Sequence, residues 1–209
     1  MNIINFFDKT YCINLDRRFD RWSECLFEFE QKRLLGINRF KAVDGNSLPK
    51  NVNGFMTPSR TALVLTNIQI LEEAIKNNYQ SILILEDDVE FTKQVTDMKS
   101  FFDSLPEDWD MLYFGGNHNT HVGSKPPAII NDKVCKLHNT FSTHCVAINN
   151  KAFIQIIERL KRCDNALDVV YSELQKKLNV YSFYPMIATQ RVSYSDIENK
   201  ITDYKWLIK

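Results

Sequence analysis

The stretch SILILEDDVEF, Ser81 to Phe91, carries an apolar run straight into three adjacent acids. Residues 82–85 are continuously apolar rather than alternating, which predicts a strand buried on both faces, as in a parallel sheet. Glu86, Asp87 and Asp88 follow at once. Packing alone gives a core strand no reason to end in such a cluster. Either the acids face water and cap the next segment, or a positive group lies against them.

Strands and helices alternate on both sides of this stretch. Two helices are predicted from apolar stripes, one carrying Trp22, Cys25, Leu26 and Phe29, and one, entered at Thr57-Pro58, carrying Val64, Ile68, Leu71 and Ile75. Further strands are predicted at 10–15, 39–45, 110–116, twice within 133–149, and at 180–185 and 186–190, with helices at about 95–104, 150–162 and 167–178 and a polar tail after them. We therefore expect an α/β sheet flanked by helices, with a small antiparallel excursion at 133–149. The expected organisation is a single domain over 1–209, which a longer protein could carry.

Composition excludes several classes of protein. The chain has 209 residues, and its 26 basic and 26 acidic residues cancel, so no bulk positive charge predicts nucleic-acid binding. No apolar run approaches the ~20 residues of a membrane span. The five cysteines are an odd number without a C-x-x-C pair, which argues against a disulfide framework or a zinc site. We expect a cytoplasmic protein, in the host cytoplasm if the chain is viral.

Polar residues follow three of the predicted strands. These strand ends are Asn14–Asp16, Asp44-Gly45 and Glu86–Asp88. Ligands of open α/β sheets bind outside the carboxyl ends of the strands, so we expect these segments to share one crevice. Carboxylates of a tight turn can hold a hard cation such as Mn²⁺ or Mg²⁺ through oxygen atoms. A metal held there can bridge a diphosphate and neutralise a leaving group.

The order of motifs along the chain resembles glycosyltransferase family 25, which includes lipooligosaccharide and procollagen galactosyltransferases. The matching segments are YCINLDRRFDRW (11–22), AVDG (42–45), LILEDDVEF (83–91), THCVAINNKAF (143–153), DVVY (168–171) and QRVSYSDI (190–197). INL and EDD are weak signals individually, but the set with its late Gln-to-Ile segment is specific and covers nearly the whole chain.

The resemblance implies a GT-A-type, Rossmann-like nucleotide-binding sheet and an inverting, Mn²⁺-dependent (or Mg²⁺-dependent) transfer of a hexose from a UDP-sugar to a hydroxyl of a glycan or protein. It implies Asp168 as the catalytic base. The metal would be held by Asp88, Glu86 and Asp196, and the nucleotide-sugar by Asn14, Leu15, Arg17, Arg21, Asp44, Glu86, Asp87 and Gln190. Arg18 is an alternative to its neighbours as a phosphate ligand, and His138 or His144 could add a metal ligand.

The chain also departs from the family pattern. Arg60 stands where the family has glutamate, Thr66-Asn67 where it has Ser-His, and His144-Cys145 where it has Gly-Tyr. The changes at Arg60 and Asn67 are the main support for a second hypothesis, a non-catalytic module that binds nucleotide-sugars or glycans. A third hypothesis is a metal-dependent phosphohydrolase, but that chemistry gathers acids from several strands around two ions. The donor sugar and the acceptor stay open.

Overall fold

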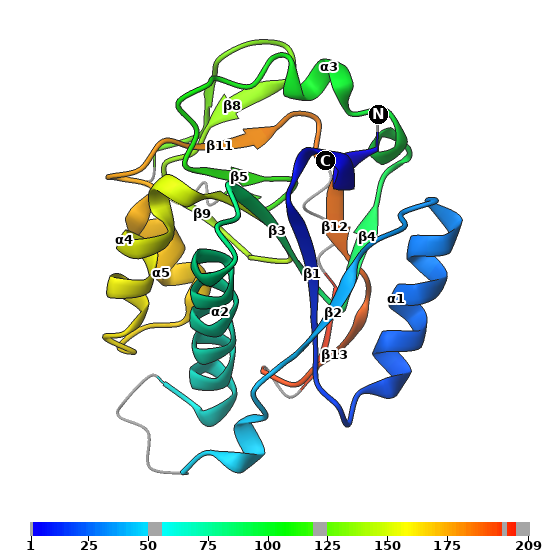
Figure 1. The fold of residues 1–209 in the computed structure, drawn as a ribbon, viewed down its shortest axis with the longest axis vertical. Helices are drawn as coiled ribbons and strands as arrows, with labels where there is room; N and C mark the ends of the chain where they lie inside the picture. The colour runs from blue at the N-terminus through cyan, green and yellow to red at the C-terminus, as the bar shows by residue number, and fades with distance from the viewer. Residues whose placement is uncertain (1, 50–55, 119–124, 198–199, 204–209) are drawn as a thin grey trace.

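The computed structural model describes residues 2–49, 56–118, 125–197 and 200–203. Its centre is an eight-stranded sheet (Figure 1). The strand order is β2 (Asn38–Lys41), β1 (Lys9–Asn14), β3 (Ser81–Glu86), β10 (Cys145–Asn149), β5 (Met111–Tyr113), β11 (Val180–Phe183), β8 (Val134–Lys136) and β7 (Ala128–Ile129).

Most strands of this sheet run in one direction. β1 is parallel to both β2 and β3, and β11 is parallel to β5. β10 is antiparallel to its neighbours β3 and β5, and β8 is antiparallel to β11 and β7. The mostly parallel α/β sheet with an antiparallel excursion, expected from the sequence, is confirmed.

The central strand β3 is buried on both faces, as its continuous apolar run predicted. Ile82 and Ile84 belong to one core cluster, together with residues of α2 (Pro58–Lys76), α4 (Asn150–Leu160) and α5 (Leu167–Leu174). Leu83 and Leu85 belong to the other cluster, which includes residues of α1 (Phe19–Gln31) and α3 (Lys99–Phe102). Figure 1 shows α2, α4 and α5 on one side of the sheet and α1 on the other. Alternate side chains of one strand therefore fill two separate cores.

Short elements complete the fold. Among the described residues, six short strands form three antiparallel pairs outside the central sheet. These pairs are β4 (Val89–Phe91) with β12 (Ala188–Gln190), β6 (Asn117–His118) with β9 (Thr140–Phe141), and β13 (Ser193–Ser195) with β14 (Lys200–Thr202). The 3₁₀ helices are η1 (Ile3–Phe6), η2 (Gly45–Ser47) and η3 (Lys93–Thr96). No helix among the described residues combines the length and apolarity needed to span a bilayer.

Two predicted helix stripes were partly wrong. Leu26 is 49% exposed and Ile75 is 42% exposed. On α1 the buried residues are Arg21, Cys25 and Phe29, so the helix is rotated to bring an arginine inward and Leu26 outward. The spacing of apolar residues did predict the helix, but a polar interaction set its rotation.

Several predicted boundaries also differ from the structure. The strand predicted at 39–45 ends at Lys41, because Asp44 turns the chain by accepting a hydrogen bond from the amide of Asn46. The helix predicted at 95–104 is divided between η3 and α3, and the helix predicted at 167–178 ends as α5 at Leu174. The segment 133–149 forms three strands instead of two, and the predicted polar tail contains β13 and β14.

Candidate active site

A cavity of about 330 Å³ lies at the carboxyl ends of β1 and β3. The segment after β1, the Glu86–Asp88 turn, the first turns of α2 and α5 and the segment 190–197 all contribute to its walls. Ten of the residues predicted from the sequence line it, namely Asn14, Leu15, Arg17, Arg21, Glu86, Asp87, Asp88, Asp168, Gln190 and Asp196. Asp44 does not line the cavity but lies beside it, with its Oδ2 3.0 Å from Nε of Arg17. The three strand ends therefore converge as expected.

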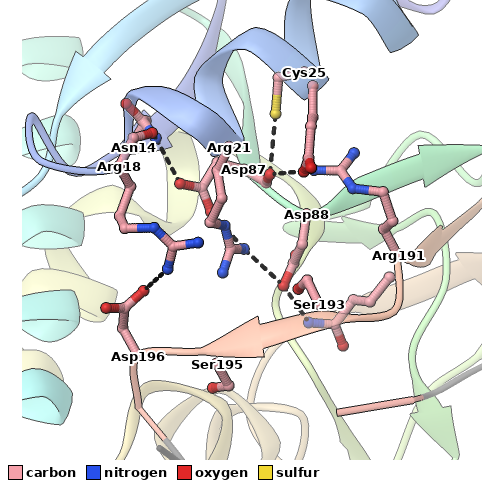
Figure 2. Close-up of polar contacts among 12 residues, drawn as sticks. Asn14, Arg18, Arg21, Cys25, Asp87, Asp88, Arg191, Ser193, Ser195 and Asp196 are labelled. Atoms are coloured by element: carbon pink, nitrogen blue, oxygen red, sulfur yellow. Dashed lines mark hydrogen bonds and ion pairs between the residues drawn. The ribbon is translucent and has the colours of Figure 1, made fainter. Parts of the chain in front are cut away.

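The positive group that lies against Asp87 and Asp88 is Arg21. Its Nη2 lies 2.6 Å from Oδ1 of Asp87 and 2.9 Å from Oδ2 of Asp88 (Figure 2). The arginine side chain is only 7% exposed, and the two aspartates are 14% and 12% exposed. Nη1 of Arg21 also donates to the carbonyl of Tyr194 at 3.1 Å. One guanidinium from α1 thus compensates two nearly buried carboxylates.

Asp87 and Asp88 differ in what their side chains offer to a ligand. Oδ2 of Asp87 accepts a hydrogen bond from Nδ2 of Asn14 at 2.6 Å, so both of its oxygens are engaged. Asp88 has a distant second donor, Nε2 of Gln190 at 3.5 Å from Oδ2. Its Oδ1 is buried and has no hydrogen-bond partner in the described part of the chain. A buried carboxylate oxygen without a partner is costly, so Asp88 is the acid of this turn that still has an unused acceptor.

Glu86 is the last residue of β3. Its Oε1 accepts a hydrogen bond from the hydroxyl of Thr143 at 2.6 Å. Burial, together with the negative charge of Asp88, raises the pKa of Glu86 to about 8. Burial also raises the pKa of Asp87, although Arg21 opposes that shift. Near neutral pH, Glu86 is therefore largely a neutral acid that can donate a hydrogen bond.

Asp168 also lines the cavity, from the first turn of α5. Its Oδ1 accepts a hydrogen bond from the amide of Val169 at 2.9 Å. Burial raises the pKa of Asp168, while hydrogen bonds from backbone amides and the charge of Arg60 lower it in part. A carboxylate with a raised pKa is a stronger base than one that is exposed to water. Asp168 and Asp88 line the same cavity, and so does Arg60.

Asp196 is held by arginines that follow β1. Its Oδ1 lies 2.8 Å from Nη1 of Arg17, and its Oδ2 pairs with Nη1 of Arg18. Arg17 also reaches Asp44, so one arginine connects two of the predicted site residues. These pairs tie the segment after β13 to the segment after β1, and Figure 2 shows the pair between Arg18 and Asp196. The sequence indicated the residues but not this pairing, because the partners lie 178 positions apart.

The two histidines considered as metal ligands do not line the cavity. His144 is buried, with Nε2 3.3 Å from the carbonyl oxygen of Ala188, and burial lowers its pKa. Burial also lowers the pKa of His138. Three further cavity residues were not predicted as site residues: Thr143, although it opens the matched segment 143–153, and Ser142 and Ser59, which had no signal beyond their places beside recognised residues.

Residues 7–165 match the family described as glycosyltransferase family 25 (LPS biosynthesis protein). A "Glycosyltransferase 25 family member" of Anopheles gambiae is 30% identical over 50% of this chain, which spans only 21% of that relative. Asp168, Gln190 and Asp196 lie beyond the matched residues.

Two solved structures share the fold at 13% identity. One is a glycosyltransferase involved in the glycosylation of the major capsid of PBCV-1, with a TM-score of 0.51 over 91% of this chain and 96% of that one. The other is A197 from STIV, with a TM-score of 0.50 over 94% of this chain and 95% of that one. The sheet is therefore of the GT-A type. Because the family match covers residues 7–165, which is most of this chain, the chain belongs to glycosyltransferase family 25.

Proposed function

We propose that this chain transfers a hexose from a UDP-sugar to a hydroxyl group of a glycan or protein, with inversion at the anomeric carbon. The observation that carries the proposal is the shared cavity. Asp88, with a carboxylate oxygen that lacks a partner among the described residues, and Asp168, a half-buried carboxylate, line the same 330 Å³ space, and so do Arg17 and Arg21. An inverting transfer needs three functions: a metal or other cation that binds the diphosphate, positively charged side chains beside that diphosphate, and a base that accepts the proton of the acceptor hydroxyl.

The residues fit a divalent metal that is completed by the substrate. The described residues include no group of three or more His, Cys, Asp or Glu side chains arranged around a metal. Mg²⁺ is often held by one or two carboxylates and substrate phosphates rather than by an all-protein cage. Asp88 would hold Mn²⁺ or Mg²⁺ through Oδ1, the oxygen that lacks a partner. When bound, the metal supplies positive charge to the leaving diphosphate.

Glu86 and Asp196 were also predicted as metal ligands. Thr143 occupies one oxygen of Glu86, and Arg17 and Arg18 occupy both oxygens of Asp196. Their roles at the metal stay predictions, and we propose Asp88 as the principal protein ligand.

The segment after β1 is the proposed nucleotide side of the cavity. Arg17 and Arg21 would bind the diphosphate, because guanidinium groups match phosphate geometry. The backbone of Asn14 and Leu15 would face uracil, with Asp44 and Gln190 at the edges of the nucleotide. The side chain of Asn14 is already used, since it donates to Asp87 and accepts from Nε of Arg39 at 2.9 Å. Its proposed contact with the base is therefore through the main chain.

Asp168 is the proposed general base. The acceptor oxygen forms a bond to the anomeric carbon from the face opposite the diphosphate. The bond between that carbon and the diphosphate oxygen breaks, and its electron pair leaves with UDP. The proton of the acceptor hydroxyl passes to the carboxylate of Asp168. Burial raises the pKa of Asp168 and so makes this carboxylate a stronger base, and the charge of Arg60 opposes that shift in part.

A non-catalytic nucleotide-sugar-binding module is the second candidate. It is favoured by the ion pairs of Arg21, which compensate Asp87 and Asp88 without a metal.

The cysteines bear on the location of the protein. All five are free thiols in the structure, and we propose a cytoplasmic protein on that basis.

Release of UDP from a panel of UDP-sugars, measured with Mn²⁺ and with chelator, tests the function. GDP- and CMP-sugars serve as donor controls, and the variants Asp88→Asn and Asp168→Asn serve as protein controls. Metal-dependent release that is lost in both variants supports the proposal. Binding of UDP without turnover in any donor and acceptor pair would instead support the binding module. Unchanged turnover in Asp88→Asn would exclude the proposed metal site.

A further inference from the structure

The turn formed by Asp87 and Asp88 is tied to the protein from behind the cavity. It connects β3 to β4, so its carbonyl groups have no strand partner in the central sheet. The carbonyl of Asp87 accepts hydrogen bonds from Sγ of Cys25 at 3.1 Å and from Nη2 of Arg191 at 2.9 Å. The carbonyl of Asp88 accepts the backbone amide of Arg191 at 2.7 Å. Figure 2 shows Cys25 and Arg191 next to this turn, on the side away from Asp196.

Arg191 is itself fixed in place by the strand that precedes it. Gln190 lies opposite Val89 in the β12–β4 pair. At the start of the same segment, the amides of Ile187 and Ala188 both donate to the carbonyl of Phe114, at 2.7 and 2.9 Å. Segment 187–191 therefore runs from the core of the sheet directly to the turn.

We propose that Arg191 is a positioning residue for the carboxylates of Asp87 and Asp88, and thereby for the metal-diphosphate that the proposed function places there. Bonds to two successive carbonyls hold the backbone of the turn, and a fixed backbone fixes the direction in which both side chains leave it. Arg191 also places a cation behind the acids, whereas Arg21 lies at their carboxylates. Groups that orient metal ligands in this way commonly change metal affinity or activity by about 10- to 100-fold when removed.

The alternative is that Arg191 merely forms a surface ion pair. Nη2 of Arg191 lies 2.9 Å from Oε2 of Glu24 on α1, and the two side chains are 24% and 55% exposed. The same atom, Nη2, makes both the ion pair and the bond to the carbonyl of Asp87. A lysine ammonium can therefore replace both contacts, and neutralising Glu24 removes the ion pair but keeps the bond to the turn.

Three variants separate these roles: Arg191→Met, Arg191→Lys and Glu24→Gln. Arg159→Met is the matched control, because Arg159 is also a poorly exposed arginine with two acidic partners, Asp164 and Glu173, and does not line the cavity. Calorimetry measures UDP affinity with Mn²⁺ and with chelator, and hydrogen exchange measures the protection of residues 86–91. All measurements are made well below the melting temperature of each variant.

We expect Arg191→Met to weaken Mn²⁺-dependent UDP binding by about 10-fold or more, with faster exchange in 86–91. Metal-free UDP binding should not change. Arg191→Lys should recover most of the affinity, and Glu24→Gln and Arg159→Met should behave as wild type. Normal Mn²⁺-dependent affinity in folded Arg191→Met, or an equal loss in Glu24→Gln, would overturn the proposal.

Failure of the proposed function has a different signature. If wild-type protein binds no UDP with Mn²⁺, the function is wrong, and the exchange rates still test whether Arg191 holds the turn. Unchanged exchange in Arg191→Met then rejects the positioning role by itself.

Discussion

Replacing Arg21 with methionine tests whether the guanidinium is the counter-charge of the acid cluster. Arg21→Met removes the ion pairs to Asp87 and Asp88, at 2.6 and 2.9 Å, and the hydrogen bond to the carbonyl of Tyr194 at 3.1 Å. Methionine keeps most of the apolar stem, so the packing of α1 against the sheet should survive. The change therefore isolates charge from volume.

The expected loss of stability follows from the burial of the three charged groups. Removing one partner of a buried ion pair costs about 3–5 kcal/mol, because an uncompensated charge remains. The unpaired carbonyl of Tyr194 adds about 1 kcal/mol. Since the aspartates keep a small exposure of 14% and 12%, the lower part of this range applies, and we expect a loss of about 4 kcal/mol. A domain of this kind has a free energy of unfolding of about 5–15 kcal/mol, so the loss is easily measured.

Urea unfolding followed by circular dichroism, at pH 7 and pH 5.5 without metal, measures the effect. Without the cation, which opposes the upward shift caused by burial, the pKa of Asp87 should rise further in the folded variant. A carboxyl whose folded pKa is raised binds its proton more readily in the folded state, so the variant should regain stability relative to wild type as the pH falls. The double variant Arg21→Met/Asp87→Asn should lose less than Arg21→Met alone, and Arg159→Met is the control for a poorly exposed arginine away from the acid cluster.

Two results would refute this reasoning. A loss below about 1 kcal/mol would mean that solvent already compensates the aspartates, as at a surface ion pair. An equal loss at both pH values, with no relief from Asp87→Asn, would mean that methionine disturbs the packing of α1 instead of the charges.

Three further predictions concern single carboxylates. Asp168→Asn should lower kcat by about 10²- to 10⁴-fold in a transfer assay while calorimetry finds UDP affinity unchanged; normal turnover would remove Asp168 as the base. Glu86 has a folded pKa of about 8 against its usual 4.5, so the stability of metal-free protein should fall as the pH rises from about 4.5 to 8, and Glu86→Gln should flatten that slope in urea titrations. Asp196→Asn removes one acidic partner each from Arg17 and Arg18, so UDP should bind more tightly in the presence of chelator; weaker binding seen only with Mn²⁺ would assign Asp196 to the metal instead.

Much of the site was predictable because its parts follow strands. The acids after β3, Asn14 after β1 and Asp44 after β2 could be placed at one edge because the carboxyl ends of parallel strands meet there. Asp168 had no comparable physical signal, since an acid in the first turn of a helix is common for electrostatic reasons. Its place in the cavity was indicated only by its resemblance to a family motif.

Local patterns also determined the main elements of the fold. The continuous apolar run of β3 encoded its burial on two faces, because successive side chains of a strand point to opposite sides. Thr57 and Pro58 encoded the start of α2: the threonine side chain accepts a hydrogen bond from the amide of Arg60, and proline is suited to the first helical position. Signals of this kind act over a few residues, so they can be read without the fold.

Tertiary structure alone decided which charges meet. The apolar spacing of α1 gave the helix but not its rotation, because Leu26 fits the same stripe as Cys25, and the buried pairing of Arg21 with Asp87 and Asp88 fixed which face turned inward. Arg191 reaches the carbonyl of Asp87 across 104 positions of sequence. Such contacts depend on the order of strands in the sheet and leave no periodic pattern along the chain. In the sequence, a charged residue that pairs with a distant partner looks the same as one that is hydrated by water.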